Sequence, residues 1–369
     1  MTMKSFLFSV AAIFLFPAFL TPVAAVDTRA IEAVRAKKVL DDADLRTIDA
    51  FVAQAVGEIL NTDDFSSISN ARSIILANSA SSQQGQVQFA QQFSESAKKH
   101  IADALRKADA LTPPGRGFKV ITNLLMLVEG LADLGLVDLP LKYVDSDNAV
   151  IRYWAVNCLA NLKVIEALNS SKESDEARQI VRRLDAIVET SAPETLGLVA
   201  AFAGSVTISD GVDLLLKVAD RRIASYADWS VQYELLDADI LRVLADKMAS
   251  SNPDKVVAGR RFGQLYSYVF QRYIKGADVL SRPQKEHLAS VLVEAEKSCL
   301  SKLIGKSSSD IRKAIESSDI NVLSREHNNL LGDSAKPGLL PTELNFDYGK
   351  DNTGAALTHP LVLADLPKN

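Results

Sequence analysis

The stretch VDLPLKYVDSDNAVIRYWAVN, residues 137–157, decides how this chain folds. Two close aspartates, Asp145 and Asp147, are followed by an arginine, a tyrosine and a tryptophan, in a chain dominated by alanine, leucine and valine. Such a group of polar and aromatic side chains is typical either of a chemical site or of a turn between two packed helices. The rest of the chain distinguishes between these two interpretations.

A partial copy of this stretch occurs further along the chain. VDLPLKYVD from Val137 aligns without gaps with VDLLLKVAD from Val212, and WAVN from Trp154 aligns with WSVQ from Trp229. The offset is 75 residues in both cases (212 − 137 and 229 − 154). Two matched blocks in one register indicate a duplicated helix–loop–helix unit. This offset holds two helical pairs of about 37 residues each, a usual length for helical solenoid repeats.

The apolar residues recur with the helical period along nearly the whole chain. Leu45, Ile48 and Val52, for example, are spaced by three and four residues, so that they share one face of a helix. Breaks such as TPPGRG, SAPE, SSNPD and SRPQ separate the helical patterns, and strand signals are scarce. We therefore expect an all-α fold built from antiparallel helix pairs. Helices are expected near residues 64–78, 86–110, 117–134, 149–168, 174–190, 193–206, 211–223, 228–248, 254–275, 283–304 and 308–320.

The stretch LPLKYVDSDNAVIRYWAVNCLANL resembles a HEAT repeat, in which a turn aspartate and a following arginine join two apolar helices. The resemblance implies that the helix pairs stack as an α-solenoid and that the protein serves as a binding scaffold. It also implies that Asp145 or Asp147, together with Arg152, contributes to a hydrogen-bonded ladder between repeats. The second copy departs from this pattern, because Ala227 stands where Arg152 would be.

The N-terminal segment has the parts of a secretory signal peptide. Lys4 precedes an apolar run over residues 6–20, and Val23 and Ala25 fit a small-x-small cleavage site. The run is short for a membrane span, which needs about 20 apolar residues. We therefore expect residues 1–25 to be removed, leaving a soluble periplasmic or extracellular protein without a stable membrane span.

The mature chain divides into three regions by its pattern. Residues 26–115 form an N-terminal helical region, and residues 116–328 contain the HEAT-like repeats. From residue 329 to residue 369 the helical period is lost and proline and glycine are frequent, which predicts an extended or disordered tail. The apolar islands GLLPTELNF and HPLVLADLP within it suit a segment that lies along the helical body or along a partner.

Composition excludes some classes of protein. A formal charge of −5 and a pI near 5.5 argue against a nucleic-acid-binding surface. Two cysteines, Cys158 and Cys299, cannot form the disulfide framework of a small secreted domain. Because each lies within an apolar helical pattern, we predict two separate buried thiols and no disulfide bridge.

No motif predicts a metal or cofactor. The four histidines are scattered, without the paired spacing of zinc ligands, and we expect each on the surface or in a loop: His100, His287, His327 and His359. GKS at residues 305–307 lacks the first glycine of a phosphate-binding loop, so Gly305 is interpreted as the left-handed end of a helix. The aspartates Asp145 and Asp147 are interpreted as caps of the following helix, because no histidine or third carboxylate stands nearby for acid–base or metal chemistry.

These observations favour a non-enzymatic scaffold that binds a protein or peptide. Asp147, Arg152 and Tyr153 are the candidate partner-binding residues, because they are the chemically distinctive part of the stretch that the second copy does not repeat. Two alternatives stay open. One is an exported helical enzyme, possibly hydrolytic, whose site is assembled between repeats, and the other is a compact bundle with a closed ligand cavity. If the two tryptophans fill equivalent cores, replacing either with alanine costs about 3–5 kcal/mol of unfolding free energy.

Overall fold

The protein is all-α, as predicted from the sequence. The computed structural model describes residues 28–79, 87–171, 174–249, 255–305, 309–350 and 354–365. Within these ranges no β-strand forms, and only two isolated bridges occur, Gly332–Pro337 and Lys350–Ala356. The expected signal peptide over residues 1–25 lies outside the described residues. No helix in the described part of the chain is both long and apolar enough to cross a bilayer.

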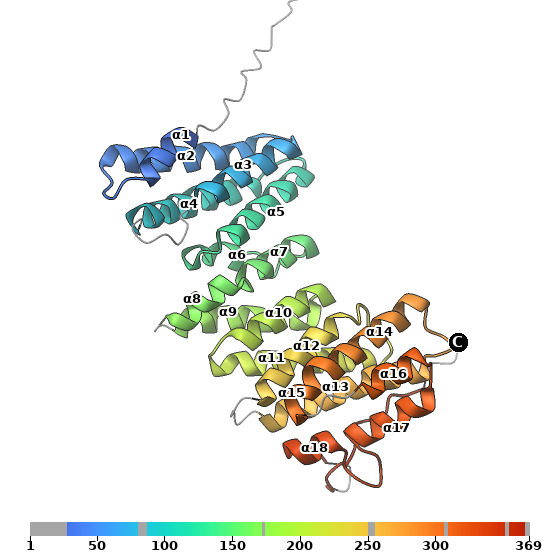
Figure 1. Cartoon of the computed structure of the whole chain (residues 1–369). Helices are drawn as coiled ribbons and strands as arrows, with labels where there is room; N and C mark the ends of the chain where they lie inside the picture. The colour runs from blue at the N-terminus through green and yellow to red at the C-terminus, as the bar shows by residue number, and fades with distance from the viewer. Residues whose placement is uncertain are drawn as a thin grey trace, which may run out of the picture.

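The helices follow one another from one end of the molecule to the other (Figure 1). Helices close in sequence are the ones that pack, with α2 against α3 and α4, α5 against α7, and α10 against α11 and α12. The first group comprises α1 (Thr28–Arg35), α2 (Asp42–Asn61), α3 (Phe65–Asn78), α4 (Val87–Ala108) and α5 (Pro114–Leu131).

The middle and C-terminal groups continue this succession. The middle group comprises η1 (Leu134–Leu136), α6 (Asp138–Leu141), α7 (Ala149–Leu159), α8 (Leu162–Ser170), α9 (Ser174–Ile187), η2 (Val188–Thr190), α10 (Pro193–Ser205), α11 (Ser209–Ala227) and α12 (Leu236–Ala249). The C-terminal group comprises α13 (Lys255–Lys275), α14 (Arg282–Glu294), the π-helical turn η3 (Ala295–Leu300), α15 (Ser301–Ile304), α16 (Asp310–Glu316), α17 (Ile320–Leu331) and α18 (Leu339–Leu344).

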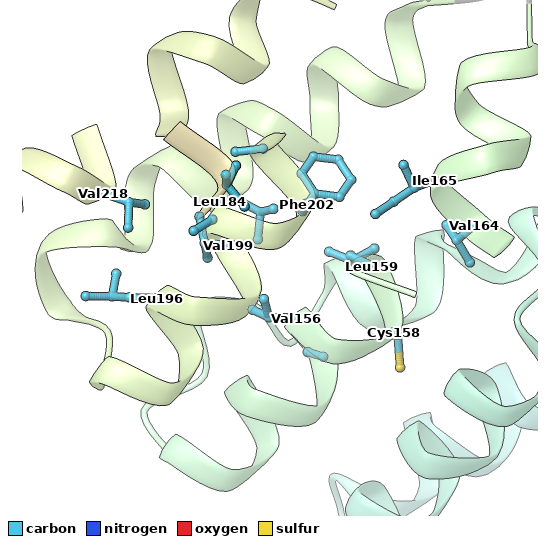
Figure 2. Close-up of a cluster of buried hydrophobic side chains, with 14 of the residues drawn as sticks. Val156, Cys158, Leu159, Val164, Ile165, Leu184, Leu196, Val199, Phe202 and Val218 are labelled. Carbon is cyan, nitrogen blue, oxygen red and sulfur yellow. The ribbon is translucent and has the colours of Figure 1, made fainter. Parts of the chain in front are cut away.

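The core lies between successive helices. Figure 2 shows Leu159 of α7, Phe202 of α10 and Leu184 of α9 in one cluster, and all three are buried. Cys158 and Cys299 are both buried and free, which confirms the prediction of two separate thiols. Gly305 ends α15 with φ = 64°, as the left-handed cap predicted for it, whereas residues 306 and 307 of the GKS motif lie outside the described residues.

The two copies of the 75-residue repeat have the same structure in their first helix and different structures in the part that follows. The first helices of the two copies correspond, because α5 and α10 are both buried helices with matching apolar residues. In the first copy the chain turns before α7, whereas α11 continues to Ala227. One difference lies in the cap: Asn148 caps the start of α7, whereas Ile223 at the matching position has no side-chain oxygen that could cap a new helix there.

The two tryptophans are therefore not equivalent. Trp154 lies within α7, whereas Trp229 lies in the loop between α11 and α12 with φ = 63°. Each is only partly buried. The expectation that Trp154→Ala and Trp229→Ala lower the unfolding free energy by the same amount required equivalent cores, and the two tryptophans do not have them.

A series of ion pairs links the turn before α7 to α9, α9 to α11, and α11 to α13. Arg183 of α9 lies 3.3 Å from Asp145, and Lys217 of α11 lies 2.9 Å from Asp185 of α9. The guanidinium of Arg261 on α13 then binds Asp220 of α11 in a bidentate manner, at 2.8 and 3.0 Å. All six side chains are partly exposed, so each pair contributes less than about 1 kcal/mol.

The C-terminal segment, by which we mean the described residues from 332 onward, lies along the helical body. α17 extends to Leu331, past residue 328 where the helical pattern was expected to end, and α18 follows it. After α18, the rings of Phe346 and Tyr348 and the backbone of Leu361 and Leu363 lie against α13. Arg260 of α13 donates to the backbone oxygen of Asp347 at 2.8 Å. This contact joins groups 87 residues apart in sequence, which no local pattern could indicate.

Candidate functional site

An open groove lies between α7, α10 and α12, with a volume of about 890 Å³. Small side chains from α10, Gly197, Ala200 and Ala201, leave the space, and larger apolar residues, Val150 and Leu236, line it on either side. α10 and α12 approach closely at Gly204, where an added Cβ atom would collide with Val243. Small residues on α10 therefore account both for this close contact and for the space of the groove.

Two tyrosines from separate elements line this groove. Tyr153 comes from α7 and packs edge-on against Trp154, with ring centroids 5.7 Å apart. Tyr233 comes from the loop between α11 and α12, and 55% of its surface is exposed. Its φ of 54° is uncommon for a residue with a large side chain, so the surrounding loop must hold it there.

A buried ion pair holds that loop. Arg222 of α11 donates from Nε and Nη2 to both carboxylate oxygens of Asp237, at 2.7 and 2.9 Å, and both side chains are almost fully buried. The Arg222 guanidinium also donates to the backbone oxygen of Gln232, next to Tyr233, at 3.1 Å. Tyr226 donates its hydroxyl proton to Asp237 at 2.7 Å, and burial raises the pKa of this phenol well above its usual value.

A second buried pair continues from the loop to α13. Arg272 of α13 lies 3.5 Å from the carboxylate of Glu234, and both are almost fully buried. The guanidinium donates to the backbone oxygen of Trp229 at 3.3 Å and stands over the indole ring, 5.2 Å from its centroid. The loop over residues 228–235 is thus anchored on both sides by charged groups that water does not reach.

The charges that line the groove are of both signs. Glu194 and Asp239 are carboxylates, and Arg242 is the one guanidinium among the lining residues. Arg242 donates to Asp239 at 2.8 Å, and this hydrogen bond raises the pKa of the guanidinium further. The groove is therefore lined mainly by apolar residues, together with a few charged residues of both signs.

The structure separates the three residues proposed as partner-binding. Tyr153 lines the groove. Arg152 donates instead to the backbone oxygen and the hydroxyl of Thr190, at 3.3 and 3.4 Å, and Asp147 lies exposed in the turn before α7. The caps predicted for α7 are wrong: Asn148 accepts from Val150 N–H at 3.0 Å, and Asp145 binds Arg183. An asparagine is an equally good cap, and its position one residue before the helix decides the choice.

A chain of hydrogen bonds elsewhere has the form of a nucleophile with its base. The Ser267 hydroxyl lies 2.8 Å from Nε2 of His327, and Nδ1 of His327 lies 2.9 Å from Oδ1 of Asn328. Ser267, however, is fully buried within α13, so no substrate could reach its oxygen. We interpret this chain as a link between α13 and α17. The expectation that every histidine lies on the surface or in a loop is wrong, since His100, His287 and His327 are all partly buried in helices.

The sequence did not reveal Tyr233 or the small residues of α10 as site residues. Tyr233 lies in the stretch WSVQYELLD, whose sequence is typical of the start of a helix. Nothing in that sequence indicates the positive φ of Tyr233. Gly197, Ala200 and Ala201 form a row of small residues, a pattern that equally suits tight helix packing. No three histidine, cysteine, aspartate or glutamate side chains gather as possible metal ligands in the described ranges.

Comparisons with known proteins give no family. No family model matches the chain, and no curated protein is similar to it. Among solved structures, an engineered protein aligns with 80% of this chain and 99% of its own length, at 14% sequence identity and a TM-score of 0.20. A TM-score of this size carries no argument about fold or function, so the interpretation depends on the groove itself.

Proposed function

We propose that this protein is an exported, non-enzymatic interaction scaffold that binds an apolar segment of a partner protein in the groove between α7, α10 and α12. The observation that carries this proposal is an open apolar groove lined by two tyrosines from separate elements, Tyr153 and Tyr233. Tyrosine is enriched among the residues that dominate binding energy at protein interfaces, because its ring buries a large area and its hydroxyl remains hydrated.

The shape of the groove favours a polypeptide over an enclosed small molecule. Its lining residues Val150 and Tyr233 are 45% and 55% exposed in the free protein, as expected of a surface that a partner covers. A partner side chain that enters the groove would contact the two tyrosines and the small residues of α10 that line it. We therefore expect a partner segment with apolar residues on one side, the mode in which an amphipathic segment binds a groove.

The HEAT-like arrangement and the export route are parts of the same proposal. The series of ion pairs Asp145–Arg183, Lys217–Asp185 and Arg261–Asp220 supports a stack of related units. The signal-like sequence over residues 1–25 supports export. The hydrolytic alternative has less support, because the serine with the geometry of a nucleophile is fully buried.

The test of the function uses one substitution inside the groove and one outside it. Ala201 is exposed and lines the groove, so Ala201→Arg fills it with a charged side chain without entering the core. Ala50→Arg, on the exposed side of α2, is the matched control. Partners are cross-linked in the cell envelope, purified with each variant and identified by mass spectrometry.

We expect a defined partner to be recovered with the wild type and with Ala50→Arg, and at least tenfold less with Ala201→Arg. Equal recovery with all three chains would reject the groove as the binding site. N-terminal sequencing of the exported protein tests the second part of the proposal. Cleavage after Ala25 makes Val26 the first residue, and an intact Met1 in the exported protein would contradict it.

A further inference from the structure

Two glutamines of α13 bind the backbone of the C-terminal segment. Gln264 accepts from Leu361 N–H at 2.7 Å and donates to Leu361 C=O at 3.2 Å. Gln271 donates to the same carbonyl at 3.1 Å and accepts from Leu363 N–H at 2.7 Å. Two side-chain amides thereby satisfy three backbone groups of an extended segment, in the way that a neighbouring strand would.

The same face of α13 holds the next residues of the segment. Lys275 donates to the backbone oxygen of Leu363 and lies 3.0 Å from the carboxylate of Asp365. The indole N–H of Trp229, from the loop before α12, donates to the backbone oxygen of Ala364 at 2.9 Å. Gln264, Gln271 and Lys275 are seven and four residues apart, a spacing that places them on one side of a helix.

The segment itself contributes few side chains to the contact. Leu363 is fully buried, but Leu361 and Val362 are 54% and 66% exposed, and Ala364 and Asp365 are exposed as well. Recognition therefore depends on backbone groups, on one apolar side chain and on one carboxylate two residues later. Any extended chain with that pattern can make the same contacts.

We propose that Gln264, Gln271, Lys275 and Trp229 form a binding site for an extended, acidic segment of a partner protein, and that residues 361–365 occupy it as an internal ligand. The partner segment carries an apolar residue at the position of Leu363 and an acidic residue at the position of Asp365. This site is separate from the groove between α7, α10 and α12 and does not depend on the function proposed for that groove.

The internal ligand can leave without unfolding the helical body. Earlier in the C-terminal segment, Phe346 and Tyr348 pack on α13 and Arg260 binds Asp347, so these residues stay in place when residues 361–365 are released. Only one side chain of residues 361–365 is buried, which keeps the loss of packing small. A tethered ligand has a high effective concentration, however, so a partner must compete with it.

The charges of the site indicate the class of partner. Lys275 pairs with Asp365 of the internal ligand, and Arg260, nearer the start of α13, pairs with Asp347. Two of the α13 cations are thus matched by carboxylates of the C-terminal segment. A partner segment with acidic residues preserves this match, whereas a basic segment would place like charges together.

The experiment measures binding of a labelled peptide to the full-length protein by fluorescence anisotropy. The peptide THPLVLAD corresponds to residues 358–365. Leu363→Asp in the protein places a charge at the buried position and releases the internal ligand. We expect the peptide to bind this variant at least tenfold more tightly than the wild type, and Gln271→Ala added to the same variant to weaken binding about tenfold.

Two altered peptides test recognition of the backbone. Leu361→Pro in the peptide removes the N–H that Gln264 accepts and should weaken binding at least tenfold. Val362→Ser changes a side chain that is 66% exposed and should leave binding unchanged. Ala201→Arg in the protein should also have no effect, which separates this site from the proposed groove.

A second release variant serves if Leu363→Asp fails to fold. Leu361→Pro in the protein removes the same N–H from an exposed residue and leaves Leu363 intact. Circular dichroism confirms that each variant is helical. Folded release variants that do not bind the peptide, or that bind it regardless of Gln271, would overturn the proposal. Exchange of the segment between two copies, seen as a dimer of the wild type without peptide binding, would overturn it too.

Discussion

The ring of Tyr348 lies directly on Gly263: a Cβ atom built at Gly263 would stand 2.8 Å from Cε1 of Tyr348 and 3.0 Å from its hydroxyl oxygen. One helical turn earlier, a Cβ at Gly259 would stand 2.8 Å from the ring of Phe346. Glycine is unfavourable inside a helix by about 1 kcal/mol relative to alanine. These two glycines of α13 are therefore explained by the rings that cover them and not by the helix.

Gly263→Ala should destabilise the packing of the C-terminal segment. The added methyl group must displace the ring of Tyr348 close to the backbone, and this loss outweighs the gain in helix propensity. We expect a decrease of about 1–3 kcal/mol in the unfolding free energy, measured by urea denaturation. Faster proteolysis after residue 345 should accompany it.

Gly57→Ala is the matched control for this substitution. Gly57 lies in the interior of α2, and the nearest atom to a Cβ there is the Asn61 side-chain nitrogen, at 3.9 Å. The same change should therefore stabilise the protein by about 0.5–1 kcal/mol. If Gly263→Ala and Gly57→Ala both raise the unfolding free energy, the ring of Tyr348 does not pack this closely on Gly263.

The sequence predicted the helices because the helical period of apolar residues is a local signal. The helix over residues 255–275 and the two buried thiols are examples. It did not predict that α11 continues past residue 223 to Ala227. It also did not predict that Arg222 is buried, since the buried partner of that arginine, Asp237, lies 15 residues further along the chain. The pair Arg221 and Arg222, taken from the sequence alone, is typical of an exposed helix face.

The candidate site was predicted only in part for a similar reason. Tyr153 stood out because it lies in an unusual stretch, and it lines the groove. Tyr233 lies 80 residues away and reaches the same groove through a left-handed backbone conformation held by buried charges. The binding of residues 361–365 by α13 joins groups 88 to 97 residues apart and leaves no periodic signal.

Protonation of His327 should weaken the fold below neutral pH. Burial, with a smaller contribution from the nearby His359, lowers the pKa of His327 from its ordinary value of 6.5. Below pH 6.5 the unfolded chain therefore binds a proton that the folded protein does not, so the unfolding free energy decreases as the pH falls, until the lower pKa of the folded protein is passed.

His327→Gln provides the comparison, because glutamine cannot gain this charge. We expect the urea midpoint of the wild type to decrease more steeply between pH 7.5 and 5.5 than that of the variant. Asp44 and Asp49 have lowered pKa values and titrate outside this range. If the urea midpoints of the wild type and His327→Gln change with pH by the same amount, protonation of His327 does not cause the pH dependence of stability.

Both thiols should be inert in the folded protein. Burial raises the pKa of Cys158, and it raises the pKa of Cys299 to about 11, so the reactive thiolate is scarce at pH 8. We expect a thiol reagent such as DTNB to label neither residue within minutes in buffer and both at once in 6 M guanidinium chloride. Rapid labelling of either thiol in the native protein would contradict the burial of that residue.

The buried pair of Arg222 and Asp237 should be the most sensitive point of the loop that carries Tyr233. Asp237→Asn keeps the size of the side chain but leaves the guanidinium without its carboxylate in a site that water does not reach. Removing one partner of a buried pair costs about 3–5 kcal/mol. Tyr226→Phe removes only the hydroxyl that donates to Asp237, and it should cost about 1.5–3 kcal/mol, as expected for a hydrogen bond to a charged group.

The double substitution separates the charge from the packing. Arg222→Met with Asp237→Leu removes both charges and retains most of the volume, so it should cost less than Asp237→Asn alone. Urea denaturation of the single and double variants measures these differences. A double variant as unstable as the sum of its single variants would mean that the two charges do not depend on each other. If the pair holds Tyr233 in place, Asp237→Asn should also reduce recovery of the groove's partner under conditions where the protein remains folded.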